Sequence, residues 1–329
     1  MQTHTASKSF EPMQRGGLFR LIGLGVMTAA AVLLAQRAGA QFQSDNFNDG
    51  NDQGWTRYNP FAGVGANIAT WTFPNGGYRI QTIAPSPDPA NLGPGRAGSV
   101  RSEIYTNFYI SVDIVNWNEN VPQAGGILAR IRNAGLGTTT GYAFTWDRGN
   151  PTNATDGDVD ISSITGEAPD GVTLTGSDRL HLNPGTSYRF VFIGKGPNLE
   201  GRVYQLPNTN TPVVQVTGFD QTYESGAGGL VIYDNSDGAD QTCDVTFDNF
   251  YAIDSEPPTL QLVDLGFNEW AVGWPADATS WKLQSTGAIG SAWTDVDPNL
   301  IVLQNDQFQL PLPAPLSTGT TTFYRLIHR

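Results

Sequence analysis

Acidic and amide side chains gather at three places in the chain, and their types suit the binding of a metal ion. They lie within residues 45–52, 156–160 and 234–248. Calcium takes six to eight oxygen ligands from carboxylates, amides and carbonyls, and acids carried on turns can supply them. The alternative is that these residues only build turns, for which Asp and Asn are well suited.

Catalytic chemistry has weak support in the sequence. Glycoside hydrolysis needs two carboxylates on either side of the scissile bond, and the glutamates of the chain are scattered. Glu119 and Asp147 each lie close to a tryptophan and could border a sugar cleft, although solvated loop residues would explain them more simply. No Gly-x-Ser-x-Gly elbow, phosphate-binding loop or His-Glu-x-x-His helix occurs. We therefore assign no catalytic residue.

Two expected strands, 126–132 and 141–146, carry side chains that suit a sugar. Alternation places Tyr142, Phe144 and Trp146 on one side of their strand, and arginines lie on the neighbouring strand. If these sides adjoin, the sheet offers an aromatic and basic surface. The predicted ligand-binding residues are Trp117, Arg130, Arg132, Tyr142 and Trp146. The alternative is that the three aromatic side chains form core, because rings on one strand face bury well.

β-strands must position these residues. From residue 41 to 256, short runs of alternating apolar and polar residues lie between clusters of Gly, Pro, Asn and Asp, which is typical of strands. The clearest run is 108–116. The other expected strands are 66–72, 77–83, 126–132, 141–146, 159–165, 188–193, 202–205, 213–217, 229–233 and 245–253. About a dozen strands predict a large antiparallel jelly-roll sandwich.

The pattern changes after Pro257-Pro258, where shorter strands begin. They are expected at 259–263, 270–274, 281–284, 301–303, 308–310 and 321–326. Six or seven short strands in residues 257–329 predict a small immunoglobulin-like or fibronectin-like β-sandwich. The chain is thus expected to hold two all-β domains, 41–256 and 257–329.

The N-terminus has the pattern of a secretory signal peptide. Lys8, Arg15 and Arg20 precede an apolar run over 21–34, and Ala38-Gly39-Ala40 offers the small residues of a cleavage site. The run is too short for a stable membrane anchor. The alternative is a buried core helix. We predict a signal peptide over residues 1–40 and an extracellular, cell-surface or periplasmic mature protein without a membrane span.

Charge and cysteine content exclude several classes of protein. The net charge of the 329 residues is −13, which argues against a nucleic-acid partner because phosphates need a basic surface. The only cysteine, Cys243, excludes an intramolecular disulfide and a cysteine-based zinc cluster. We assign no role to Cys243.

Several short segments carry a resemblance to known families. They are Asp45-Asn46-Phe47-Asn48-Asp49-Gly50, Gly54-Trp55, Gly141-Tyr142-Ala143-Phe144 and Thr246-Phe247-Asp248-Asn249-Phe250. Residues 41–255 resemble the concanavalin A-like jelly rolls of the lectin, glucanase and laminin-G type. The resemblance implies a carbohydrate-related role. It also implies a calcium ion shared by adjacent first and last strands, for which the predicted ligands in this chain are Asp45, Asn48, Asp49 and Asp248.

The last segment has a resemblance of its own. With Leu283-Gln284-Ser285, Trp293-Thr294 and Phe323-Tyr324-Arg325-Leu326 it resembles a small β module of secreted verrucomicrobial and planctomycete proteins. That resemblance implies no biochemical activity.

Three functional classes follow from these observations. The first is a non-catalytic secreted protein that binds glycans or another extracellular polymer. The second is a structural or adhesion component of the cell surface or matrix, with a cell-surface protein as partner. The third is a glycoside hydrolase or lyase with an unrecognised pair of carboxylates.

Overall fold

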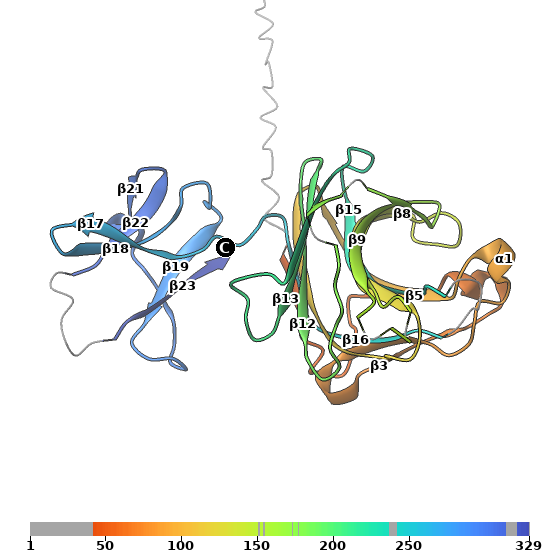
Figure 1. Cartoon of the computed structure of the whole chain (residues 1–329). Helices are drawn as coiled ribbons and strands as arrows, with labels where there is room; N and C mark the ends of the chain where they lie inside the picture. Colours follow the sequence, from red (N-terminus) through yellow and green to blue (C-terminus); the bar gives the residue numbers. More distant parts are fainter. Residues whose placement is uncertain are drawn as a thin grey trace, which may run out of the picture. The chain divides into compact units, whose positions relative to one another are not determined.

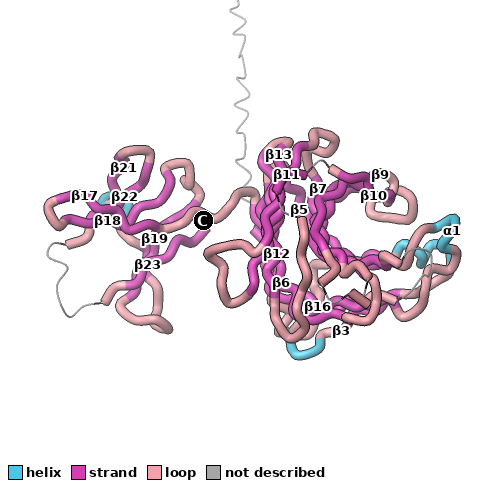
Figure 2. The backbone as a smooth tube through the Cα atoms, in the orientation of Figure 1, coloured by secondary structure: helices cyan, strands magenta, loops and turns pink. Residues whose placement is uncertain are grey.

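The described part of the chain is almost entirely strand and turn. The computed structural model describes residues 42–150, 152–153, 155–172, 174–176, 178–236, 242–313 and 321–328, and Figure 2 shows how little of it is helical. Short helical turns occur at η1 (Pro60–Val64), η2 (Pro74–Gly76), α1 (Pro89–Leu92) and η3 (Pro298–Leu300). The all-β prediction is confirmed. The predicted signal peptide lies outside the described residues, and no described helix is long and apolar enough to cross a membrane.

Two antiparallel sheets contain all strands from β1 to β16, and Figure 1 shows them facing each other. The nine-stranded sheet holds β1 (Phe42–Asp45), β3 (Ala69–Thr72), β4 (Tyr78–Thr82), β6 (Phe108–Trp117), β11 (Leu174–Gly176), β12 (Tyr188–Lys195), β13 (Asn198–Gln205), β14 (Val214–Phe219) and β16 (Asp244–Ile253). The seven-stranded sheet holds β2 (Thr56–Tyr58), β5 (Arg96–Tyr105), β7 (Gln123–Arg132), β8 (Thr140–Asp147), β9 (Asp158–Thr165), β10 (Ala168–Gly171) and β15 (Gly226–Asp234). This is the predicted jelly-roll sandwich.

The strand order explains where distant segments meet. The nine-stranded sheet runs β11-β14-β13-β12-β6-β16-β4-β3, with β1 paired to β16. The seven-stranded sheet runs β10-β9-β8-β7-β15-β5-β2. Asp45 of β1 lies opposite Phe250 of β16, so the first and last strands of the sandwich are neighbours, as expected.

The main core fills the space between these two sheets. Phe144 of β8 lies 5.7 Å from both Phe190 and Phe192 of β12, measured between ring centroids. Trp146 of β8 lies 5.5 Å from Trp117 of β6. Aromatic pairs at such distances add to the stabilisation that burial alone provides.

The remaining strands form two smaller sheets. They are β17 (Gln261–Gly266), β18 (Glu269–Pro275), β19 (Trp281–Thr286), β20 (Thr294–Asp295), β21 (Val302–Gln304), β22 (Gln307–Pro311) and β23 (Phe323–His328). The sheet orders are β17-β18-β22-β21 and β20-β19-β23. Lettered in chain order with β20 as C′, these are A-B-E-D and C′-C-F, which is the arrangement of immunoglobulin-type sandwiches. Trp274 and Leu283 belong to the apolar core of these two smaller sheets.

Candidate functional site

The outer face of the seven-stranded sheet, turned away from the main core, carries a groove of about 600 Å³. Its orientation follows from the alternation of β15, because Leu230 and Ile232 belong to the core while Val231 and Tyr233 point the other way. The loop around α1 contributes Asn91 to the wall. A volume in this range is typical of small-ligand sites.

Two glycines lie beside Val231 on the neighbouring strands. Val231 lies directly opposite Gly98 of β5 and Gly126 of β7, and directly paired residues share one face of a sheet. A Cβ atom at Gly126 would lie 2.2 Å from the carbonyl oxygen of Phe144, and one at Gly98 would lie 2.4 Å from that of Leu230. Neither position admits a side chain, so no side chain lies directly opposite Val231 on either neighbouring strand.

Aliphatic side chains cover the rest of the floor. Leu128 of β7, Ala143 of β8 and Ile164 of β9 pack with Val231 in a second apolar cluster, separate from the main core. All four line the groove. They belong to four different strands that the register of the sheet brings together.

A buried ion pair crosses above this floor. Arg96 of β5 and Glu167, from the turn between β9 and β10, approach to 2.7 Å, although their strands lie far apart in the sheet order. Arg96 also donates to the carbonyl oxygens of Leu92 and Pro94, each at 2.9 Å. The Glu167 carboxylate accepts a hydrogen bond from the backbone N–H of Gly137. The pair therefore holds three loops together at one side of the groove.

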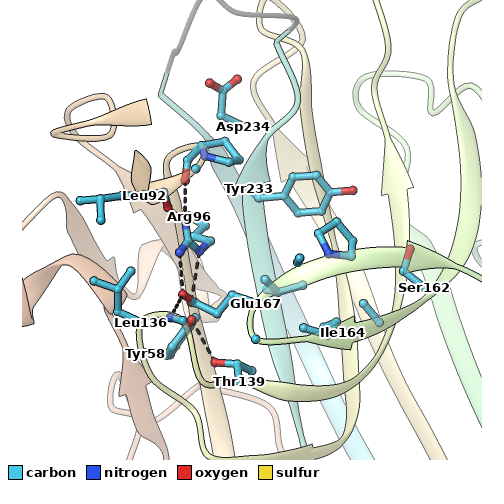
Figure 3. A pocket seen from close by; sticks show the side chains of 18 of the residues that line it. Tyr58, Leu92, Arg96, Leu136, Thr139, Ser162, Ile164, Glu167, Tyr233 and Asp234 are labelled. Atoms are coloured by element: carbon cyan, nitrogen blue, oxygen red, sulfur yellow. Dashed lines mark hydrogen bonds and ion pairs between the residues drawn. The ribbon is translucent and has the colours of Figure 1, made fainter. Parts of the chain in front are cut away.

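Figure 3 shows Arg96 and Glu167 beside Tyr58 and Thr139, whose hydroxyl donates to the Tyr58 hydroxyl at 3.2 Å. Burial raises the pKa of the Glu167 carboxyl to about 7 and lowers that of the Arg96 guanidinium to about 10, while the opposite charge at 2.7 Å favours the ionised form of both groups. Each charge alone would be costly in this place, so each depends on the other.

Hydroxyl groups line the opposite side, where Figure 3 shows Tyr233 and Ser162. Thr145 of β8 donates to the carboxylate of Asp160 at 2.9 Å, and Ser162 donates to the same carboxylate. Burial raises the pKa of the Tyr233 hydroxyl, and Asp160 adds to this effect. The groove thus combines an aliphatic floor with a polar rim.

An acidic row continues beyond this rim on β8 and β9. It consists of Asp147, Asp158 and Asp160, with Asp147 directly opposite Asp158. Burial raises the pKa of Asp147 to about 6, and the charges of Asp158, Asp160 and Asp156 add to it. Burial and neighbouring carboxylates raise the pKa of Asp158 as well. Among the described residues, no cation forms an ion pair with the three members of the row.

We expect Asp147→Asn to stabilise the protein at pH 8 by about 1 kcal/mol, after allowance for partial exposure to water. A raised pKa means that the folded chain binds the proton more tightly than the unfolded chain. The ordinary pKa of an aspartate is 3.8. The contribution of Asp147 to the free energy of unfolding is therefore fully present below pH 3.8 and is lost as the pH rises through its folded-state pKa of about 6. Denaturant unfolding at pH 8 and pH 4.5 measures the effect. The stability advantage of the Asp147 variant should vanish at pH 4.5. The control is Asp170→Asn on the exposed strand β10, which should be as stable as the wild type at both pH values.

The structure corrects most of the predicted ligand-binding residues. Trp117, Arg130, Tyr142 and Trp146 are at most 7% exposed and lie inside the sandwich. Arg132 is exposed, and its guanidinium donates to the carbonyl oxygen of Ser225 at 2.7 Å. The alternative that the aromatic side chains form core is the one that the structure shows. These five residues do not form a shared binding surface, and the groove lies on the opposite face of β8.

The two carboxylates of the predicted catalytic alternative have different partners. Arg148 lies 3.0 Å from Glu119, which accepts a further hydrogen bond from the indole N–H of Trp117. Asp147 instead belongs to the acidic row. Neither residue lines the groove, so the two carboxylates do not face one another across it.

The predicted calcium ligands lie in two neighbouring segments. Asp45 accepts hydrogen bonds from the N–H of Phe47 at 2.9 Å and the indole of Trp55 at 2.8 Å. Asp49 accepts from the N–H of Asn51 at 3.2 Å, as expected for a turn. Burial raises the pKa of Asp248, and the charge of Asp45 contributes.

These contacts give the proposed ion little support. Within the described ranges, no three His, Cys, Asp or Glu side chains come together in a way that could hold a metal ion. The oxygens of Asp45 already have donors, and calcium would need six or more ligands. Asn48 and Asp49 precede the tight turn at Gly50, whose N–H donates to the carbonyl oxygen of Phe47. Calcium stays a prediction from the sequence.

Comparison with known proteins finds similar solved structures but no matching family. No family model matches it, and a search of curated proteins finds no match. Among solved structures it is similar to the carbohydrate-binding module CBM66 from Bacillus subtilis, with 17% identity and a TM-score of 0.42 over 62% of this chain and 97% of the module.

It is also similar to lectin II from Ulex europaeus, with 10% identity and a TM-score of 0.43 over 65% of this chain and 97% of the lectin. A GH43 protein from Bacillus licheniformis, BlXynB, shows 12% identity and a TM-score of 0.42 over 64% of this chain and 39% of that protein. At these identities and scores, the similarity describes the fold and no property of the site.

Proposed function

We propose that this protein binds saccharide chains in the groove on the outer face of the seven-stranded sheet. The observation that carries the proposal is the combination of an aliphatic floor and a polar rim in one groove. A sugar ring has a face of C–H groups and an edge of hydroxyls, so it fits a site with both kinds of surface. Apolar pockets with a few well-placed polar groups are the usual form of ligand sites.

Binding without cleavage fits the placement of the carboxylates. Asp147, Asp158 and Asp160 lie side by side on β8 and β9, and Glu167 is engaged by Arg96. Hydrolysis needs two carboxylates that face each other across the bond that breaks. We therefore propose a binding protein, and we expect no release of reducing ends from bound polysaccharide.

We also propose that the protein acts outside the cytoplasm. The pattern of residues 1–40 supports this, because a basic segment, a short apolar run and Ala38-Gly39-Ala40 follow one another as in signal peptides. Extracellular polysaccharide would then be the accessible ligand. N-terminal sequencing of the exported protein tests the proposal, and a mature N-terminus near Gln41 is the expected result.

We expect Val231→Phe to abolish retention on polysaccharide. Val231 lines the groove, so the added ring would occupy the space above the aliphatic floor. The measurement is a pull-down with insoluble chitin, cellulose and xylan, followed by isothermal titration with soluble fragments of any polymer that retains the wild type. The apparent affinity should fall at least tenfold.

Val213→Phe is the matched control, because Val213 is 49% exposed and precedes β14 of the other sheet. It should bind as the wild type does. Thermal melting of both variants shows that they fold. Absence of wild-type retention on every polymer, or equal binding by the Val231 variant, would contradict the proposed function.

A further inference from the structure

We infer that the groove selects uncharged saccharides that carry an acetyl group, whose methyl lies on the aliphatic floor beside Val231. This inference rests on the proposed function and names the class of ligand for the same groove. Three features of the groove carry it. They are the aliphatic character of the floor, the small size of the apolar surface at Val231 and the charges around the groove.

The centre of the floor is aliphatic rather than aromatic. Among the described residues that line the groove, only Tyr58 and Tyr233 carry aromatic rings. Tyr58 is about 9% exposed and engaged with Thr139, and Tyr233 pairs with Arg96 at the edge of the floor. A flat sugar ring held mainly by stacking needs an aromatic ring beneath it. The floor instead suits a compact apolar group such as a methyl.

The apolar surface around Val231 is small. Val231 lies opposite Gly98 and Gly126, where the neighbouring backbone leaves no room for a Cβ atom. In the next row Leu128 and Ala143 lie directly opposite each other. The apolar groups at this part of the floor are therefore few and short, and they suit a compact group such as a methyl.

The charges around the groove disfavour anionic sugars. Arg96 is the cation that lines the groove, and its charge is paired with Glu167. A carboxylate or sulfate on the ligand would therefore find no free cation there. It would also approach the acidic row of Asp147, Asp158 and Asp160, which would repel it. Within the described part of the chain, no cation forms an ion pair with this row. Acetylation adds a methyl and a carbonyl without adding charge.

The test compares three tetrasaccharides with one backbone and different substituents at a single carbon. Chitotetraose carries acetamido groups, cellotetraose carries hydroxyls, and the glucosamine tetramer carries ammonium groups. Isothermal titration at pH 7.5 should give a dissociation constant for chitotetraose at least fourfold lower than for cellotetraose, the ratio expected from burial of one methyl group. Tighter binding of the glucosamine tetramer than of chitotetraose would show that the acidic row, and not the floor, selects the ligand.

Val231→Thr keeps the shape of the side chain and replaces one methyl by a hydroxyl. It should reduce the preference for chitotetraose over cellotetraose to less than twofold. Ile164→Thr repeats the test at a second floor position, in case one variant does not fold. Val213→Thr at the exposed site outside the groove should keep the full preference.

The outcomes separate this inference from the proposed function. Equal binding of chitotetraose and cellotetraose, or tighter binding of the glucosamine tetramer, overturns the acetyl preference while saccharide binding stands. Failure of all three tetramers, with retention on another polymer of the panel, overturns it as well. Failure of every saccharide removes both proposals. A preference for L-fucose over L-galactose as competitor, without one for the acetylated tetramer, assigns the methyl site to a 6-deoxy sugar and overturns the acetyl assignment.

Discussion

Replacement of Arg130 by methionine is expected to lower the free energy of unfolding by about 4 kcal/mol. The side chain is 2% exposed, and its guanidinium donates to the carbonyl oxygens of Thr106 at 3.0 Å, Tyr223 at 2.9 Å and Gly196 at 2.7 Å. Methionine fills similar space but donates no hydrogen bond. Three carbonyl groups from three separate loops would be left unsatisfied, at a cost of about 1–3 kcal/mol each, partly offset because the charge no longer has to be buried.

Arg132→Met provides the comparison for this prediction. Arg132 lies two residues further along β7 and is exposed, with hydrogen bonds to Ser225 alone. Its replacement should change stability by no more than about 1 kcal/mol. Urea unfolding of both variants measures the difference. Similar losses for both arginines would show that the buried network of Arg130 does not hold the loops together.

The position of Arg130 also shows why the predicted ligand face was wrong. Simple alternation places Arg130 with Leu128 on the outward face of β7. The register between β7 and β8 shifts between Ala129 and Arg132, and Arg130 has a positive φ of 51°. This bulge turns the side chain inward, over the rings of Phe108 and Tyr142. A bulge depends on pairing with neighbouring strands, so the sequence of one strand does not reveal it.

Alternation predicted most strands of the fold but not which face of a sheet is core. Tyr142, Phe144 and Trp146 share one side, as expected, and that side is buried. The opposite side of β8 carries Ala143, Thr145 and Asp147, which are small or polar, and it borders the groove. The sequence itself shows that the large side chains of this strand share one side and the small or polar ones share the other. This difference favours the alternative in which the aromatic side chains form core.

Strand β5 was not predicted, because Arg96-Ala97-Gly98-Ser99-Val100-Arg101 lacks apolar alternation. Its glycine and small residues nevertheless have a structural reason. Gly98 faces Val231 from β5 as Gly126 does from β7. Glycine inside a strand is a signal of close backbone approach or of a ligand site, and this signal would have pointed to the groove. The juxtaposition itself requires the order β7-β15-β5, which only long-range pairing establishes.

The second large effect is expected at the ion pair that crosses the groove. Glu167→Gln should lower the free energy of unfolding by about 3 kcal/mol, because it leaves the Arg96 charge buried without a counter-ion. The side chains of Arg96 and Glu167 are only 12% and 6% exposed. Glu224→Gln, on an exposed residue before β15, should change stability by less than about 0.5 kcal/mol. Denaturant unfolding at pH 7.5 gives these values.

The reason for the loss can be separated from its size by a double-mutant cycle. Arg96→Met combined with Glu167→Leu removes both charges and leaves apolar side chains in the same space, which often costs little for a buried pair. The double variant should therefore be more stable than either Glu167→Leu or Arg96→Met alone. If the two single losses simply add, the cost comes from disturbed loop packing and not from an isolated buried charge. In that case the contacts of Leu92, Pro94 and Gly137 hold the wall of the groove, and the ion pair is incidental.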